Sequence, residues 1–244
     1  MERKTHKVLG YDVDLMTFKD ALLFVEKKLK NNEGMHVVTI NPEIIEHANK
    51  DNSFSPILRN ADLVIPDGIG IKIALKLKGI QQEQIPGIEF AKETIAICEK
   101  LTKSIALIGA KEEVIQKAKS ELLNEYKNLN ICYSHNGYFS QDEEKNIISD
   151  LQNASPAVVL VALGAPKQDL FIQACKEKMP NTIFIGVGGS FDVWAGVVER
   201  APECYRKIGC EWLYRTIKQP QRLKRIYKTL PLFLFKAIIE ATKK

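Results

Sequence analysis

The fold is decided by one stretch, Leu63-Val64-Ile65-Pro66-Asp67-Gly68-Ile69-Gly70, in which an apolar run ends and an amphipathic run begins. The apolar residues predict a buried strand, the Pro-Asp-Gly sequence predicts a turn, and residues 69–77 predict a helix. Asp67 is therefore expected at the carboxyl end of a strand, where open α/β sheets bind ligands. A carboxylate there is a candidate general base, although an aspartate at such a position more often shapes the turn or caps the helix.

The same alternation of strand and helix extends on both sides of this stretch. Short apolar runs predict strands at 37–40, 61–65, 105–109, 131–133, 157–163 and 182–187, with an edge strand at 8–15. Helical spacing of apolar residues predicts helices at 17–30, 42–49, 51–60, 69–77, 88–102, 111–126, 142–151 and 167–179. This order predicts a Rossmann-like α/β fold with a doubly wound, largely parallel sheet.

The composition is that of a globular protein, with 45% hydrophobic and 27% charged residues in 244. The first residues do not lead into an apolar signal segment, and no apolar run approaches the ~20 residues of a membrane span. We therefore expect a cytoplasmic protein. Five cysteines without a Cys-x-x-Cys motif predict reduced thiols, and four scattered histidines give no metal-ligand spacing.

The carboxyl-terminal part differs from the rest in charge. Residues 200–244 contain 12 Lys or Arg against 3 Asp or Glu, whereas the whole chain has a net charge of only +5. We expect an α/β catalytic domain at 1–195 and a helical appendage at 196–244, with helices at 203–218 and 221–239. The last helix mixes basic with apolar and aromatic residues, which suits a membrane surface better than nucleic acid. Alternatively, its apolar side packs on the core.

Five predicted strands end in polar or glycine-rich loops. The loops are Thr39-Ile40-Asn41-Pro42, Pro66-Asp67-Gly68, Asn136-Gly137-Tyr138-Phe139, Leu163-Gly164-Ala165-Pro166-Lys167-Gln168-Asp169 and Gly186-Val187-Gly188-Gly189-Ser190-Phe191-Asp192. In a parallel sheet they meet at one edge and form one crevice. The last loop can present backbone N–H groups to a phosphate, but it lacks the Gly-x-Gly-x-x-Gly pattern of dinucleotide sites.

One metal-like motif, Asp12-Val13-Asp14, imitates the Asp-x-Asp sequence of many sugar-nucleotide enzymes. It falls on a predicted edge strand near the start of the chain. We expect ordinary surface charge there, because aspartate is mostly exposed. The sequence therefore predicts no metal site.

The five loops occur in a fixed order with two later motifs, Arg200-Ala201-Pro202 and Glu211-Trp212-Leu213-Tyr214-Arg215. Over residues 8–228 this set resembles the TagA/WecG/CpsF family of glycosyltransferases, family 26. The resemblance implies metal-independent, inverting transfer from a UDP-sugar to polyprenyl-diphosphate-linked N-acetylglucosamine at the inner membrane face. In the TagA branch the donor is UDP-N-acetylmannosamine, and the β-1,4-linked product begins wall teichoic acid. Other branches use N-acetylmannosaminuronic acid or glucose-type donors.

The resemblance also assigns roles by position. Asp67 would be the general base that takes the proton of the acceptor hydroxyl. Thr39 and Asn41 would line the sugar site, and Gln168 would contact the donor. Gly188 and Gly189 would face the diphosphate. Three arginines of the appendage would close over the site and neutralise a diphosphate: Arg215, Arg222 and Arg225.

The chain departs from the family around residues 84–89, where Gln84 and Glu89 replace the frequent Arg and Asp. This departure leaves the donor sugar open. Two other classes also stay open: a nucleotide-dependent oxidoreductase, which tight NAD binding would favour, and a non-enzymatic membrane or nucleic-acid binding module, in which Asp67→Asn would change nothing. Neither a cofactor nor nucleic acid is expected, and a homo-oligomer stays open.

Overall fold

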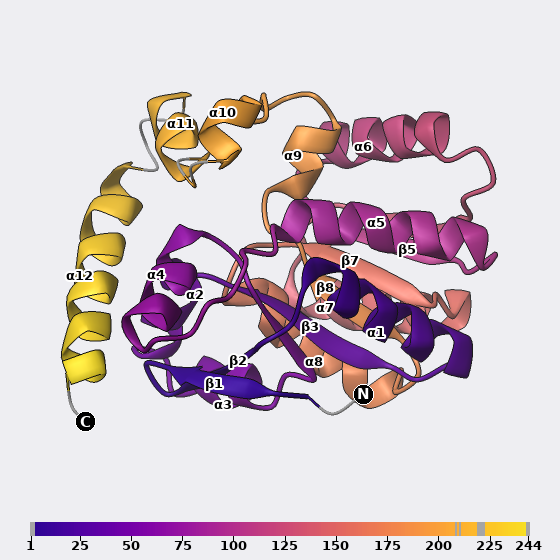
Figure 1. Cartoon of the computed structure of the whole chain (residues 1–244). Helices are drawn as coiled ribbons and strands as arrows, with labels where there is room; N and C mark the ends of the chain where they lie inside the picture. Colours follow the sequence, from indigo (N-terminus) through magenta and orange to yellow (C-terminus); the bar gives the residue numbers. More distant parts are fainter. Residues whose placement is uncertain (1–2, 208, 210, 219–222, 243–244) are drawn as a thin grey trace.

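The computed structural model describes residues 3–207, 209, 211–218 and 223–242. In these residues six strands form one sheet in the order β4-β3-β8-β7-β5-β6, and every neighbouring pair is parallel (Figure 1). The strands are β3 (Met35–Ile40), β4 (Leu63–Pro66), β5 (Ile105–Gly109), β6 (Ile131–His135), β7 (Val158–Ala162) and β8 (Ile183–Gly186). The predicted doubly wound α/β fold is confirmed.

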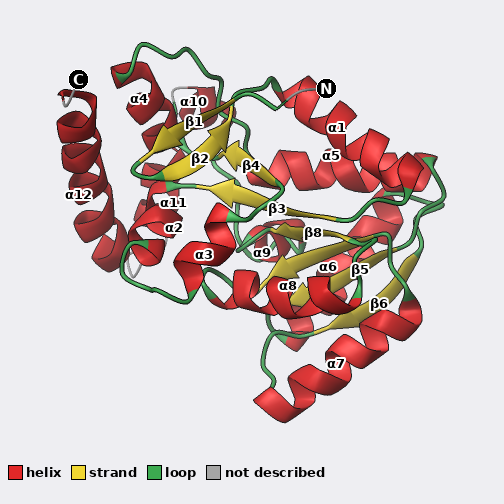
Figure 2. Ribbon diagram, turned by 90° about the horizontal axis from the view of Figure 1, so that it is seen from below, coloured by secondary structure: helices red, strands yellow, loops and turns green. Residues whose placement is uncertain are grey.

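Helices cover both faces of the sheet (Figure 2). One face carries α1 (Phe18–Asn31), α5 (Gly87–Lys100), α6 (Glu112–Glu125) and α9 (Ser190–Trp194). The other carries α2 (Pro42–Ala48), α3 (Phe54–Arg59), α4 (Ile69–Leu77), α7 (Gln141–Ala154) and α8 (Lys167–Lys178). Since side chains of a strand alternate between faces, Val37 joins the first core and Val38 the second.

The predicted edge strand at 8–15 is instead a hairpin of β1 (Thr5–Val8) and β2 (Tyr11–Asp14), which forms a separate two-stranded sheet. The expectation of surface charge in this motif is wrong for Asp14, whose side chain is fully buried. Its carboxylate accepts two hydrogen bonds from the Arg3 guanidinium and one from the Val64 N–H, each 2.7 Å long. The carboxylate therefore covers a backbone donor at the edge of the main sheet.

The predicted helix at 203–218 is divided into α10 (Glu203–Lys207) and α11 (Glu211–Lys218). Gly209 lies between them with a φ of +73°, a conformation that favours glycine, and its backbone lies close to the Ile69 side chain. The last helix, α12 (Leu223–Thr242), packs on α2 and α4 and buries Phe233 and Ala237 completely. The predicted break at Gln219-Pro220 lies outside the described residues.

The cysteines in the described part of the chain are free thiols of unlike exposure. Cys98 and Cys175 are buried, whereas Cys204 is exposed. Burial raises the pKa of the Cys98 thiol to about 12, so this side chain acts as a small apolar core residue. Among the described residues, no helix combines the length and the apolar character that crossing a bilayer requires.

Candidate active site

The carboxyl ends of β3 and β8 form the switch point of the sheet. These strands are neighbours, yet the chain leaves β3 into α2 on one face and leaves β8 into α9 on the other. Connections that diverge in this way open a crevice at the strand ends, which is where ligands bind in open α/β sheets. Four of the predicted site residues, Asn41, Asp67, Gly188 and Gly189, follow β3, β4 and β8 at this edge.

Asp67 and Asn41 lie side by side at the ends of paired strands. Pro66 of β4 pairs with Ile40 of β3, and the Asp67 N–H donates to the Ile40 carbonyl at 2.8 Å. The Asn41 side-chain oxygen caps α2 by accepting the Ile44 N–H at 3.0 Å. Asp67 is half-buried, so it is partly desolvated but still accessible to solvent.

Thr39 is buried, and its hydroxyl is engaged within the sheet. It donates to the carbonyl of Gly186 on the neighbouring strand at 3.2 Å. Gly87, at the start of α5, packs so closely on Thr39 that a Cβ there would lie 2.7 Å from its Cγ2. Thr39 thus joins β3 to β8 beneath the site.

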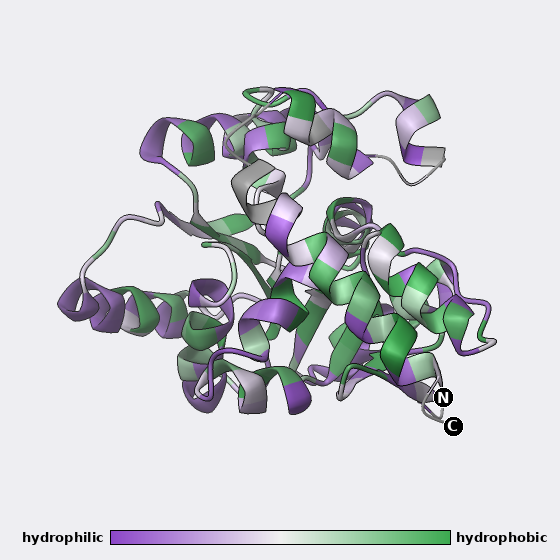
Figure 3. Cartoon of the chain, turned by 90° about the vertical axis from the view of Figure 1, so that its left-hand side faces the viewer, coloured by the Kyte–Doolittle hydropathy of each residue, from purple (hydrophilic) through white to green (hydrophobic). Residues whose placement is uncertain are grey.

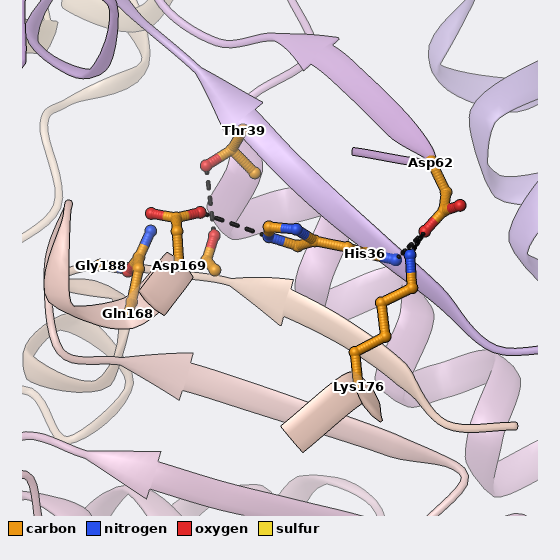
Figure 4. Close-up of polar contacts among 8 residues, drawn as sticks. His36, Thr39, Asp62, Gln168, Asp169, Lys176 and Gly188 are labelled. Carbon is orange, nitrogen blue, oxygen red and sulfur yellow. Dashed lines mark hydrogen bonds and ion pairs between the residues drawn. The ribbon is translucent and has the colours of Figure 1, made fainter. Parts of the chain in front are cut away.

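Gln168 adds a second polar contact at the carboxyl end of β8, beside the one from Thr39 (Figure 4). Its side-chain oxygen accepts the Gly188 N–H at 3.3 Å, and its amide nitrogen lies 2.5 Å from where a Cβ on Gly186 would stand. Gly186 therefore leaves the space that the Gln168 side chain fills. Gln168 is only 4% exposed, so its position is set by packing rather than by solvent.

A hollow of about 540 Å³ lies beside these contacts, over the ends of β5, β6 and β7. Its lining consists of Ala110, Gly137, Tyr138, Phe139, Ser140, Glu143, Ala162, Leu163 and Lys167. The Lys167 ammonium donates to the Gly137 carbonyl at 3.1 Å and lies 4.5 Å from the centre of the Phe139 ring. The loop at 136–139 was predictable from its polar and glycine residues, but the contribution of Ala110 was not, because a small apolar residue has no chemical signature.

The three predicted arginines fall on parts that the structure does not describe in full. Arg222 lies outside the described residues. Arg215 is on α11 and Arg225 is on α12, but both side chains lie outside the described part. Their convergence on the crevice therefore stays a prediction.

Glu89 on α5 ties the segment after α9 to the body of the protein. Its carboxylate binds the guanidinium groups of Arg200 and Arg206. The side chains of Glu89 and Arg200 are 28% and 27% exposed, so the ion pair is largely shielded from solvent. This departure from the family pattern thus has a structural partner in the appendage.

Replacing Glu89 by glutamine is expected to loosen residues 200–218. The neutral amide loses charge-assisted hydrogen bonds of about 1.5 to 3 kcal/mol. Limited trypsin digestion should therefore cleave this segment several times faster. Glu93→Gln, an exposed position one turn further along α5, is the matched control. Equal cleavage rates in the two variants would contradict this role of Glu89.

A parallel α/β sheet with polar residues and a glycine loop at the carboxyl ends of adjacent strands defines the class: a doubly wound fold of the kind that binds ligands at this edge. The sequence model of the Glycosyl transferase WecG/TagA/CpsF family matches residues 6–244, so the chain belongs to this family and is a glycosyltransferase. The resemblance noted in the loops is confirmed.

Two curated relatives are similar over almost their whole lengths. The chain is 33% identical over 242 residues to the N-acetylglucosaminyldiphosphoundecaprenol N-acetyl-beta-D-mannosaminyltransferase of Bacillus subtilis (strain 168), covering 98% of this chain and 92% of the relative. It is 31% identical over 242 residues to the enzyme of the same name from Staphylococcus aureus (strain MW2), covering 97% and 93%.

Proposed function

We propose that this protein transfers N-acetylmannosamine from UDP to polyprenyl-diphosphate-linked N-acetylglucosamine with inversion, forming the β-1,4 linkage that begins wall teichoic acid. The family and the names of the two relatives support the donor and acceptor classes. One observation of the structure supports the proposal. Asp67 after β4 lies beside Asn41 after β3, and the loop with Gly188 follows β8, the strand on the other side of β3.

Asp67 is the proposed general base. Its carboxylate takes the proton of the acceptor hydroxyl while that oxygen forms a bond to the anomeric carbon of the donor sugar. The bond from that carbon to the diphosphate oxygen breaks on the opposite face, and UDP leaves with the electron pair. Such a displacement requires a base on one side and a stabilised leaving group on the other.

The donor is proposed to lie along the carboxyl edge of the sheet. The sugar lies near Thr39 and Asn41, and the diphosphate faces Gly188 and Gly189. The hollow over β7 and β5 begins one strand away from the glycine loop that follows β8. Because neighbouring strands are about 4.8 Å apart, a nucleoside attached to the diphosphate can reach it. The aromatic ring of Tyr138, 72% exposed at the hollow, suits stacking on a base. Gln168 contacts the donor between its diphosphate and its nucleoside.

The appendage is proposed to supply positive charge and membrane contact. Three arginines close over the site and neutralise the leaving or lipid diphosphate: Arg215, Arg222 and Arg225. Figure 3 shows the side of the molecule that carries α12. The inward side of α12 is apolar, whereas Tyr227, Phe235 and Ile238 are 73%, 63% and 50% exposed. Aromatic and apolar side chains beside a basic segment suit the surface of the cytoplasmic leaflet.

Placing glutamate at Phe235 and Ile238 together is expected to weaken binding to anionic lipid vesicles at least about tenfold, because two apolar anchors are replaced by charges that the lipid repels. A vesicle sedimentation assay measures this. Leu123→Glu on α6, also an exposed apolar position, is the matched control and should bind like the wild type. Equal binding of all three proteins would contradict membrane contact through α12.

The transfer reaction is tested by UDP release from UDP-N-acetylmannosamine, with and without a prenyl-diphosphate-linked N-acetylglucosamine analogue. Acceptor-dependent release is expected. Release from UDP-glucose or UDP-N-acetylmannosaminuronic acid instead would retain the family activity and change the donor. Absence of release from all three donors would overturn the proposal.

A further inference from the structure

We propose that a buried pair, His36 on β3 and Asp169 on α8, is a positioning device that holds Gln168 against the glycine loop. The two residues act through Gln168 and touch no proposed substrate. The inference rests on the proposed function only where Gln168 contacts the donor. The structural part, that this pair sets the position of Gln168, stands on the geometry alone.

The pair is almost completely withdrawn from solvent. The His36 Nε2 atom lies 3.3 Å from Asp169 Oδ1, and the side chains are 2% and 1% exposed (Figure 4). Within the described residues, neither the Asp169 carboxylate oxygens nor the His36 Nε2 atom has a hydrogen-bond partner, so the 3.3 Å contact between them is electrostatic. The imidazole is therefore the polar group that the structure places against this carboxylate.

Burying a carboxylate in this way is costly, and an apolar pair of similar volume would usually hold a helix on a sheet at least as well. The neighbouring contacts of α8 are indeed apolar, through Phe171, Ile172 and Cys175. Apolar contacts are individually non-directional, whereas a polar contact between two defined atoms favours one rotation of the helix about its axis. The pair therefore has a directional role that the apolar contacts lack.

Gln168 is the residue that this rotation would move. It directly precedes Asp169 in the first turn of α8, so the two side chains turn together about the helix axis. Its oxygen must reach the Gly188 N–H, and its amide nitrogen must fit the space left by Gly186. A small rotation of the first turn would break both contacts.

A second polar contact, through Asp62, also connects His36 to α8. It offers a control for the effect of the buried pair on Gln168. The His36 backbone N–H donates to the Asp62 carboxylate at 2.7 Å, and Lys176 donates to the same carboxylate. Lys176 is seven residues from Asp169, which places the two ties of α8 about 10 Å apart along the helix. The far tie joins the same helix to Asp62, just before β4, and through Asp62 to the His36 backbone, but it lies two turns from Gln168.

Three variants separate positioning from stability. Asp169→Ala removes the carboxylate and leaves His36 unpaired in the core. The double variant His36→Leu with Asp169→Leu removes both polar groups, which keeps the core apolar and preserves folding even if the single variant unfolds. Lys176→Met removes only the far tie. Each protein is measured for hydrogen exchange of the Gly188 amide, for UDP affinity by calorimetry, and for KM and kcat of UDP release.

The Gly188 amide should exchange about tenfold faster in Asp169→Ala and in the double variant, because its N–H no longer donates a hydrogen bond to the Gln168 side-chain oxygen. UDP affinity should fall about tenfold in both, and KM for the donor should rise by a similar factor with little change in kcat. Lys176→Met should lower the melting temperature while Gly188 exchange and UDP affinity keep their wild-type values.

A double variant with wild-type Gly188 exchange and wild-type UDP affinity would show that the pair is only structural and would overturn the inference. If Lys176→Met lost as much protection of the Gly188 amide and as much UDP affinity as the double variant, the inference would be overturned as well. If the wild type bound no UDP, the proposed function would fail, and exchange of the Gly188 amide would still decide whether the pair holds Gln168.

Discussion

Asp67→Asn is expected to lower the rate of acceptor-dependent UDP release by about 10² to 10⁴, the usual contribution of a general base. Asparagine keeps the size and the polar surface of the side chain but cannot take a proton from the acceptor hydroxyl. The backbone hydrogen bond from residue 67 to the Ile40 carbonyl does not involve the side chain, so the turn should persist. UDP affinity should therefore change little.

The control for Asp67→Asn is Asp12→Asn, the same change of charge on the hairpin, where Asp12 forms an exposed ion pair with Lys7. This variant should release UDP at the wild-type rate. Acceptor-dependent release that survives in Asp67→Asn would retain the glycosyltransferase and place the base elsewhere. A parallel loss of UDP affinity would mean that Asp67 acts in binding rather than in proton transfer.

Gly109→Ala is expected to lower the free energy of unfolding by about 2 to 6 kcal/mol, since a strained backbone and a steric clash each cost about 1 to 3 kcal/mol. Gly109 ends β5 with a φ of +128°. A Cβ there would lie 2.4 Å from the carbonyl oxygen of Ala162, a backbone atom of β7 that cannot move away cheaply. The melting temperature should fall by about 10 °C in a chain of this length.

Gly79→Ala separates the two causes of that loss. Gly79 also has a positive φ, +77°, but nothing lies within 4 Å of a Cβ built there. Backbone strain alone should cost about 1 kcal/mol, with a fall of a few degrees in the melting temperature. Equal shifts in the two variants, measured by calorimetry, would contradict the clash.

Because Ala110 and Ala162 line the hollow, Gly109→Ala should also weaken UDP binding, whereas Gly79→Ala should not.

Much of the fold was predictable because strand and helix patterns are local. The continuous apolar run at 157–163 predicts a strand buried on both faces, and β7 occupies its central five residues. The predicted helix opened by Thr17 begins there, with the Thr17 hydroxyl accepting the Asp20 N–H. The hairpin at the start of the chain was missed because Leu9 and Gly10 interrupt the strand with positive φ angles that periodicity does not reveal.

The sequence by itself determined that the chain alternates strands with helices and that Asp67 and the glycine loop stand at strand ends, because these properties depend on neighbouring residues. Only the tertiary structure decided which distant groups meet. Thr39 donates to Gly186 because β3 and β8 are adjacent, although 147 positions separate the two residues. His36 meets Asp169 because α8 packs over β3 as well as over β8. Such contacts depend on the order of strands in the sheet, which no local pattern encodes.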